Sequence, residues 1–256
     1  MKGGSFTIVV PAYNEEEAIA SIITRCLAAR ELICGKTGLS SVEVLVVDDG
    51  SRDGTRRIAE GFPEARLVVH PVNRGYGRAL MTGFENAGGD YLGFLDADGT
   101  CDPLAFVDLF KALEDKDAVM AVGNRLHEGS RMPAVRFLGN RAYAAIISRL
   151  PGTPVGDSAS GMRVFTRELL PRLKPLPTGL HFTPAMTARV ASMGARIAET
   201  PIPYAERQGQ SKLNVFVDGM RFLSVILGII FAYFPLRIFG PLGGSFAALA
   251  FLLGLK

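Results

Sequence analysis

Short apolar runs alternate with helix-compatible stretches over residues 6–123. The runs are rich in β-branched and aromatic residues, which predicts strands, and the segments between them open with polar, Gly or Pro residues, which predicts helix starts. The expected strands are residues 6–10, 42–47, 66–70, 91–95 and 118–122, and the expected helices lie around 15–30, 53–61, 75–87 and 103–114. This alternation favours an α/β fold with a mostly parallel sheet and flanking helices.

The pattern changes twice further along the chain. Residues 125–210 are less regular, with proline-rich turns at 151–154 and 171–177, a helical segment near 182–193 and a strand near 195–199. Residues 222–255 are apolar almost throughout, and Arg237 is the only charged residue among them. We therefore divide the chain into a polar domain, residues 1–212, and a tail, residues 213–256.

The tail has the composition of a membrane segment, but it contains breaks. Pro235 and Pro241, with the glycines at 240, 243 and 244, predict two short segments rather than one. Residues 222–234 are too few to cross a bilayer, whereas residues 238–255 come close to the roughly 18 to 20 apolar residues required. We expect helices that associate with membrane lipids, with Arg221, Arg237 and Lys256 near the headgroups. A helical hairpin buried in a soluble core is the alternative.

Composition and charge narrow the partners and the compartment. The 256 residues include 28 Lys and Arg and 25 Asp and Glu, and this net charge of +3 is too balanced for a general nucleic-acid-binding protein. The three cysteines, Cys26, Cys34 and Cys101, have no metal-binding spacing and indicate a reducing compartment. Because the first apolar run is too short for a signal peptide, we expect the domain to be cytoplasmic.

Polar residues follow four of the expected strands at their carboxyl ends. They are Tyr13, Asn14 and Glu15 after the first strand, Asp48 and Asp49 after the second, Asn73 and Arg74 after the third, and Asp96 and Asp98 after the fourth. In an open parallel sheet, ligands bind beyond the carboxyl ends of the strands. We therefore expect these side chains to gather around one ligand.

Asp96 and Asp98 are the strongest candidates for metal ligands. They stand two apart at the end of an apolar strand, so their side chains point to the same side and repel each other unless a cation lies between them. Mg²⁺ or Mn²⁺ would take oxygen ligands from one or both carboxylates and from a diphosphate. The alternative is a solvated carboxylate pair in the turn before Gly99.

Three further segments suit other parts of a nucleotide. Residues 46–55 place two carboxylates and a turn where they can hold a base and a ribose. Residues 9–18 add Tyr13 for a planar ring and Glu15 for ribose hydroxyls. Residues 73–79 combine Arg74 and Arg78 with two glycines, a basic and backbone-exposed segment that suits phosphate. The first two segments are equally compatible with a simple strand-to-helix turn or a capped helix start.

The motifs occur together, and as a set they are specific. PAYNEEE, VVDDGSRDGT, NRGYGRA and DADG, in this order, resemble family-2 glycosyltransferases with the GT-A fold, which implies a Rossmann-like, mixed sheet. GNR at 123–125, DSASGMRVF at 157–165, PIPY at 201–204 and ERQGQSKL at 206–213 are similar to the dolichyl-phosphate mannose synthase branch and its bacterial polyprenyl-phosphate relatives. The resemblance covers residues 6–222.

The resemblance implies a role for each matching residue. It assigns the nucleoside to Pro11, Tyr13, Glu15, Val47 and Asp49; the ribose, diphosphate and metal to Asp96, Ala97 and Asp98; and the phosphates of donor or lipid to Arg125, Arg207 and Lys212. Thr100 stands where that branch often has Gln as a further site residue, and Gly99 stands where it commonly has Leu. The sugar therefore stays open.

We expect an inverting glycosyltransferase that depends on Mg²⁺ or Mn²⁺. A sugar would pass from GDP-mannose or a UDP-hexose to a polyprenyl or dolichyl phosphate, whose anionic oxygen needs little help from a base. Asp157 would orient the acceptor or act as a base, or it would be a helix cap or the partner of Arg163. The alternative is a glycan or other non-lipid acceptor in cell-envelope polysaccharide synthesis. Assembly into a homo-oligomer is left open.

Other protein classes fit less well. A processive polysaccharide synthase usually carries a Gln-x-x-Arg-Trp motif, and this chain has no tryptophan. A nucleotidyltransferase would have a Gly-rich basic loop after the first strand, where this chain is acidic. A catalytically silent scaffold is disfavoured by the intact Asp96, Asp98, Arg207 and Lys212. Three scattered histidines (His70, His127, His181) and two serines without a histidine partner (Ser158, Ser160) do not support a hydrolase triad.

Overall fold

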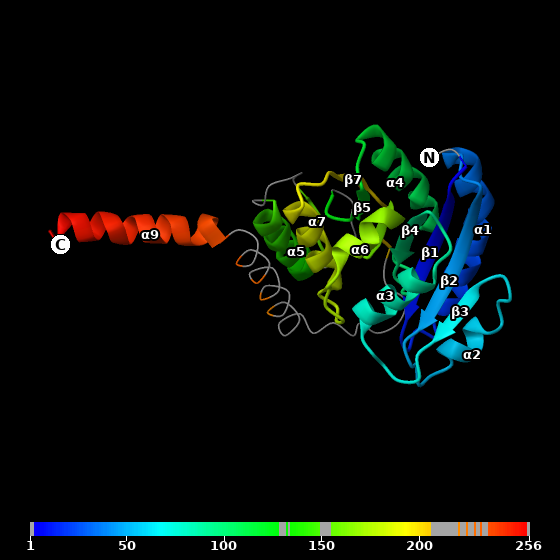
Figure 1. Cartoon of the computed structure of the whole chain (residues 1–256). Coiled ribbons are helices and arrows are strands. Elements are labelled where there is room, and N and C mark those ends of the chain that lie inside the picture. Colours follow the sequence, from blue (N-terminus) through cyan, green and yellow to red (C-terminus); the bar gives the residue numbers. More distant parts are fainter. Residues whose placement is uncertain are drawn as a thin grey trace.

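The computed structural model describes residues 3–127, 132, 134–148, 155–205 and 235–254, and positions 220, 224, 228 and 231. In this part of the chain, seven strands form one sheet with the spatial order β3-β2-β1-β4-β6-β5-β7 (Figure 1). The strands are β1 Ser5–Ala12, β2 Ser41–Asp48, β3 Arg66–Val69, β4 Tyr91–Leu95, β5 Met120–Asn124, β6 Met162–Thr166 and β7 Ile197–Pro201. Strand β6 runs antiparallel to both of its neighbours and the other pairs are parallel, so the sheet is mixed but mostly parallel, as predicted.

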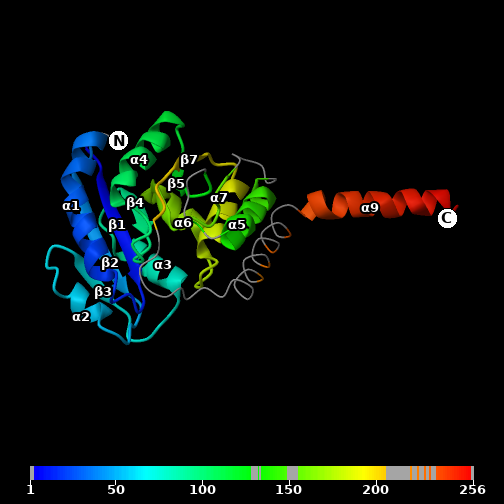
Figure 2. The ribbon, with the colours of Figure 1, turned by 180° about the vertical axis from the view of Figure 1, so that it is seen from behind.

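Helices cover both faces of the sheet (Figures 1 and 2). Their bounds are α1 Ile19–Thr37, α2 Thr55–Ala59, α3 Tyr76–Asn86, α4 Phe106–Asp115, α5 Ala134–Ile147, α6 Leu170–Leu173, α7 Phe182–Ser192 and α9 Pro235–Leu252. Short 3₁₀ turns at Pro103–Ala105 and Arg167–Leu169 lead into α4 and α6. Helices α1 and α4 share one apolar cluster with the sheet, and α3 and α7 share the other.

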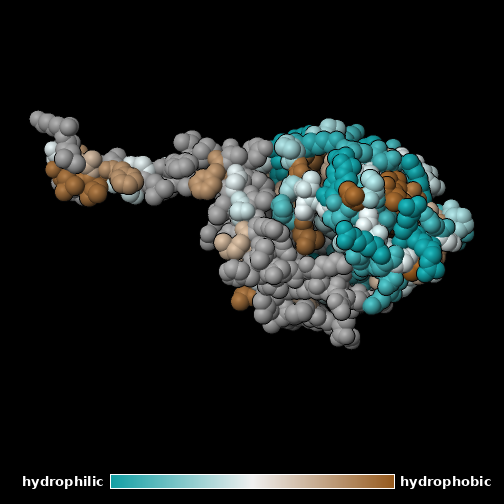
Figure 3. Space-filling model, turned by 90° about the horizontal axis from the view of Figure 1, so that it is seen from below, coloured by the Kyte–Doolittle hydropathy of each residue, from teal (hydrophilic) through white to brown (hydrophobic). Residues whose placement is uncertain are grey.

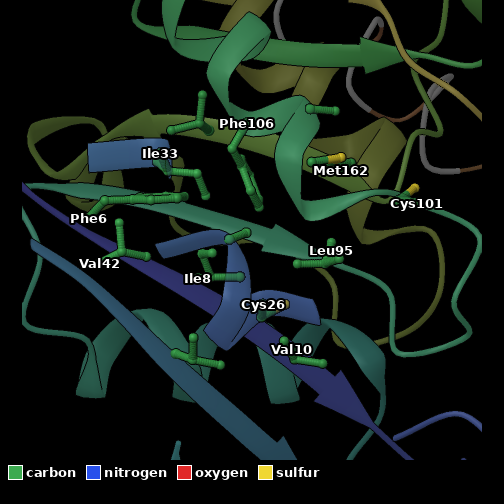
Figure 4. Close-up of a cluster of buried hydrophobic side chains, with 14 of the residues drawn as sticks. Phe6, Ile8, Val10, Cys26, Ile33, Val42, Leu95, Cys101, Phe106 and Met162 are labelled. Carbon is green, nitrogen blue, oxygen red and sulfur yellow. The ribbon is translucent and has the colours of Figure 1, made fainter. Parts of the chain in front are cut away.

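The two clusters follow from the alternation of side chains along the central strand. Phe6, Ile8 and Val10 of β1 are fully buried toward α1 and α4 (Figure 4). Val9, between them, is buried toward α3. The ring of Phe6 meets that of Phe106 edge-on, with centroids 4.9 Å apart. Burying each such side chain contributes about 1.5–3 kcal/mol. The period of two in the sequence thus fixes which face of the strand each helix covers.

The structure confirms all five strands predicted over the first half, with small differences at their ends. It also contains one strand that the sequence pattern did not indicate, β6, which inserts between β4 and β5. Arg163 interrupts the apolar pattern of β6, yet its side chain is fully buried. Helix α1 begins at Ile19, later than expected, because the carbonyl of Glu15 accepts from the amides of Ala18 and Ile19 in a turn.

Helix α9 stands apart from the sheet and its helices (Figures 1 and 2). It begins at Pro235, where a break was predicted, but neither Pro241 nor the glycines after it interrupt the helix. Phe246, Leu249 and Phe251 are exposed on it, and apolar colour gathers there in Figure 3. Among the described residues, no helix combines the length and the apolar character needed to span a membrane. The expected segment at 222–234 falls mainly outside the described residues.

Candidate functional site

The carboxyl ends of three strands meet at one edge of the sheet. Strand β1 lies between β2 and β4, with Ala12 opposite Asp48 and Val9 opposite Phe94. The strand order reverses at β1, since β2 and β3 continue to one side of it and β4 lies on the other. Ligands of open α/β sheets bind at such a switch point. The loops after β1, β2 and β4, which carry the predicted site residues, therefore start side by side.

The loops after β1 and β2 are tied together by hydrogen bonds. The amide of Asn14 donates to Ser51 Oγ over 2.9 Å, and the amide of Glu15 donates to Thr55 Oγ1 over 2.7 Å. The side-chain oxygen of Asn14 accepts from the Arg52 amide at 2.8 Å. These contacts hold one compact unit that presents Tyr13 and Glu15, both partly exposed.

Pro11 and Val47 lie opposite each other in β1 and β2, and both are buried. The Val47 side chain belongs to the apolar cluster shared with α3. Ala97, after β4, is likewise buried, in the cluster on the opposite face. Any contact from Val47 or Ala97 to a nucleotide would therefore come from the backbone.

Asp49 is almost fully buried, with 2% exposure, and it organises the start of α3. Its carboxylate accepts from the amides of Arg74 at 2.9 Å and Gly75 at 2.8 Å. His70 Nδ1 donates to the same carboxylate over 2.6 Å, while Nε2 lies 3.0 Å from the hydroxyl of Thr82. The one sign of this role of His70 in the sequence is its position directly after β3.

The segment 73–79 differs from the backbone-exposed phosphate loop that we predicted. The amides of Gly77 and Arg78 donate to the carbonyl of Thr178, at 2.7 and 3.2 Å. Gly75 has φ +96°, and a Cβ there would lie 2.6 Å from the Thr178 oxygen. The glycine therefore allows α3 to approach the loop before α7. The side chain of Arg74 is exposed and can contact a phosphate, whereas Arg78 Nη2 lies 3.9 Å from Glu85 Oε2.

Two hydroxyl groups hold the carboxylates of the loop after β4. The hydroxyl of Tyr76 donates to Asp96 Oδ1 over 2.7 Å. Thr100 donates its amide, at 3.1 Å, and its hydroxyl, at 2.7 Å, to Oδ1 of the nearly buried Asp98. Thr100 thus orients Asp98, and it is itself 3% exposed.

The donor chemistry of this loop suits a hard cation. Asp96 and Asp98 offer carboxylate oxygens, the ligands that Mg²⁺ and Mn²⁺ prefer. In the described part of the chain, no three His, Cys, Asp or Glu side chains come together as a metal site by themselves. A cation here would need further oxygen ligands, such as those of a diphosphate.

Arg125 and Asp157 form a buried, two-pronged ion pair. Arg125 Nε and Nη2 donate to the two carboxylate oxygens at 2.7 and 3.1 Å, and the Arg125 amide donates at 3.1 Å. The guanidinium carbon lies 5.5 Å from the ring centroid of Tyr204. Burial disfavours the Arg125 cation, but the charge of Asp157 and the hydrogen bonds to it raise the pKa of Arg125 overall.

This geometry corrects the partner considered for Asp157 and bears on its role as a base. Its partner is Arg125, and not Arg163. The Asp157 carboxylate has no exposed surface, and it also accepts from the amide of Ala159 at 3.2 Å. A carboxylate enclosed by four N–H donors is poorly placed to take a proton from an acceptor.

Arg163 is fully buried and supports the chain just before β6. Its guanidinium donates to the carbonyls of Ser160 at 3.1 Å and Ser158 at 2.6 Å, and to the hydroxyl of Thr187 at 2.7 Å. Burial lowers the pKa of Arg163 to about 10. The sequence suggests Arg163 only as a partner for Asp157, because its true acceptors are backbone carbonyls and a hydroxyl on the distant α7.

Arg207 and Lys212 lie outside the described residues. The described chain before them runs beside the loop after β4, since the Ala205 amide donates to the Thr100 carbonyl over 2.9 Å. Cys101 and Tyr204 also form an isolated bridge there.

Comparison with known proteins gives a family, relatives and a fold. The model of glycosyl transferase family 2 matches residues 7–173. The low-salt glycan biosynthesis hexosyltransferase Agl6 of Haloferax volcanii is 33% identical over 227 residues, which make up 87% of this chain and 53% of that protein. A dolichyl-phosphate hexose transferase of the same organism is 34% identical over 214 residues, covering 83% of this chain and 88% of that protein. The chain thus spans about half the length of Agl6.

Among solved structures, glucosyl-3-phosphoglycerate synthase of Mycobacterium tuberculosis is similar at 22% identity, over 89% of this chain and 80% of that one. Its TM-score is 0.68 for the complex with phosphoglyceric acid, and 0.61 for the complex with Mn²⁺, UDP and glucosyl-3-phosphoglycerate. This similarity confirms the predicted fold.

Proposed function

The chain belongs to glycosyl transferase family 2, and we propose that it transfers a sugar from a nucleotide-sugar to a polyprenyl phosphate. The observation that carries the proposal is the meeting of the loops after β1, β2 and β4 at the switch point, with Asp96 and Asp98 in the last of them. We call these three loops the donor site. The similarity to a dolichyl-phosphate hexose transferase supports the acceptor class.

The loops after β1 and β2 would bind the nucleoside. Tyr13 offers a ring to a base and Glu15 a carboxylate to ribose hydroxyls, both from the unit that the Asn14 and Thr55 contacts hold in place. Pro11 and Val47 would contribute backbone. Asp49 would act indirectly, because its carboxylate is used to fix the start of α3.

Asp96 and Asp98 would hold Mg²⁺ or Mn²⁺, and both ions fit their oxygen donors. When bound, such an ion offsets the charge that develops on the leaving diphosphate. The crystal structure of the Mycobacterium tuberculosis synthase with Mn²⁺ and UDP supports a divalent ion in this fold. Thr100 would keep Asp98 in position throughout, since both of its donors point to that carboxylate.

The proposed acceptor needs cationic side chains that orient it more than it needs a general base that removes a proton. A lipid phosphate is already anionic at neutral pH, so its oxygen can attack the anomeric carbon directly, and one displacement inverts that centre. Arg125, which Asp157 and Tyr204 hold in place, would orient a phosphate, as would Arg74, Arg207 and Lys212. The enclosed Asp157 fits this mechanism, because no proton has to be removed by it.

We further propose that the tail binds membrane lipids while the domain stays on the cytoplasmic side. The exposed apolar side chains of α9 support lipid contact. Removing residues 222–256 should release the protein from vesicles in a flotation assay and leave nucleotide binding unchanged. Firm attachment of the shortened chain would contradict the role of the tail.

The acceptor class is tested with a matched pair of lipids. Protein in detergent is given Mn²⁺ and a panel of radiolabelled UDP- and GDP-sugars, with either polyprenyl phosphate or the corresponding polyprenol. We expect label in the organic phase with polyprenyl phosphate but not with polyprenol. Only one of the nucleotide-sugars should supply that label. Binding of a donor without transfer to the lipid, or transfer to a water-soluble glycan instead, would contradict the acceptor assignment.

A further inference from the structure

We propose that Tyr76 is a positioning residue of the donor site, whose hydroxyl sets the orientation of the Asp96 carboxylate together with the bare backbone of Gly161. This inference rests on the proposed function, since it assigns both residues to the site that would bind the nucleotide-sugar and its metal ion. Tyr76 lies inside the motif NRGYGRA, whose two glycines are explained by their close approach to the loop before α7.

Tyr76 is anchored on both sides by the backbone. It is the first residue of α3, and the preceding Gly75 donates its amide to Asp49 while the following Gly77 donates its amide to Thr178. The ring packs against the apolar cluster on the α3 side of the sheet. The hydroxyl is thereby carried to Asp96 Oδ1, at 2.7 Å, from a fixed base.

Gly161 closes the other side of the same carboxylate. Leu95 pairs with Met162 in the antiparallel ladder of β4 and β6, and the same register places Asp96 opposite Gly161. A Cβ built on Gly161 would collide with Oδ2 of Asp96. Arg163 keeps this backbone in place through the carbonyls of Ser158 and Ser160. The carboxylate is thus held between a hydroxyl and a residue that has no side chain.

The hydroxyl of Tyr76 is the donor in this contact, because an ionised carboxylate can only accept hydrogen bonds. Asp98 has the equivalent donor in Thr100. Each carboxylate of the pair therefore has its own hydroxyl, and the orientation of both is set before a cation or a nucleotide arrives.

The test compares Tyr76→Phe with Tyr91→Phe, the same chemical change at the opposite end of β4, where the ring packs on Phe110. Isothermal titration measures the Kd of UDP and of GDP, each with and without Mn²⁺, for both variants and the wild type. For whichever nucleotide the wild type binds, we expect about tenfold weaker binding by Tyr76→Phe in Mn²⁺, the low end for a hydrogen bond to a charged group. Tyr91→Phe should bind as the wild type does.

A second variant keeps the inference falsifiable if Tyr76→Phe folds poorly. Gly161→Ala should also weaken Mn²⁺-dependent binding, and combining it with Tyr76→Phe should add little, because both act through Asp96. Unchanged binding by Tyr76→Phe, or a lower Tm with unchanged Kd, would overturn the positioning role. Wild-type protein that binds neither nucleotide in a Mn²⁺-dependent manner would instead overturn the proposed function.

Discussion

Arg125 and Asp157 form a buried ion pair, and breaking it should lower the thermal stability by an amount that is easily measured. Replacing Asp157 by Asn keeps the shape of the side chain but removes the charge that compensates Arg125. The side chains are 9% and 0% exposed, so solvent cannot take over that role. Arg125 now donates two side-chain N–H groups to the Asp157 carboxylate. The NH₂ group of Asn would face one of these donors and could not accept from it.

Breaking one partner of a buried ion pair costs about 3–5 kcal/mol in the free energy of unfolding. For a domain of this size, each kcal/mol corresponds to about 2–4 °C in Tm, so Asp157→Asn should lower Tm by about 6–20 °C. The change should also reduce transfer, because Arg125 would no longer be held against Tyr204.

Thermal unfolding followed by circular dichroism checks the stability, with Asp117→Asn as the matched control. Asp117 makes its ion pair with Arg196 at the surface, where its side chain is 86% exposed, so the same substitution should shift Tm by less than about 4 °C. The double variant Arg125→Gln with Asp157→Asn should lose less than the two single variants together.

Equal Tm values for Asp157→Asn and Asp117→Asn would refute the reasoning, because they would mean that the buried pair is no more important than a surface one. Full transfer by Asp157→Asn would refute the link between this pair and the acceptor. Both outcomes are read from the same protein preparations.

Three further predictions use other parts of the chain. Asp98→Ala should lower the initial rate of transfer by about 10³-fold while the protein still unfolds cooperatively. Undiminished transfer would contradict the role of Asp98 in holding the metal ion. Burial alone would raise the pKa of Glu43, but hydrogen bonds from Thr7 and Gly88 and the charge of Arg66 lower it. The ionised Glu43 therefore stabilises the fold above its unfolded-state pKa near 4.5, and this stabilisation is lost as pH falls through the lower folded-state pKa. Glu43→Gln should thus flatten the acid side of a plot of Tm against pH. A variant that keeps the wild-type slope there would contradict this role of Glu43. Cys26 and Cys101 are buried, and burial raises the pKa of each thiol to about 12, whereas Cys34 is partly exposed. Mass spectrometry should therefore find one iodoacetamide adduct in native protein, on Cys34, and three adducts in denaturant. A native protein that gains more than one adduct would contradict that burial.

The sequence predicted those parts of the fold that depend on local periodicity. The strands of the first half were predictable because β-branched runs alternate with helical stretches, and the approach of their carboxyl ends follows from parallel topology. The sequence alone therefore predicts that Asp96, Asp98, Tyr13 and Glu15 lie near one edge of the sheet.

The remainder depends on contacts between distant residues. Strand β6 was missed because its Arg163 finds an acceptor on Thr187, 24 residues away. The glycines of NRGYGRA suggested a phosphate loop, but Thr178 explains them, and nothing in the local sequence indicates that neighbour. The partner of Asp157 was uncertain for the same reason, since Arg125 lies 32 residues before it.

The central claim is that Asp96 and Asp98 support a metal-dependent transfer of sugar to a lipid phosphate. The most direct measurement is the initial rate of label transfer from the preferred nucleotide-sugar to polyprenyl phosphate, before EDTA, after EDTA, and after Mn²⁺ or Mg²⁺ is restored. We predict that EDTA abolishes transfer and that one of the two ions restores it in the wild type but not in Asp98→Ala. Transfer that continues at full rate in EDTA would contradict the claim.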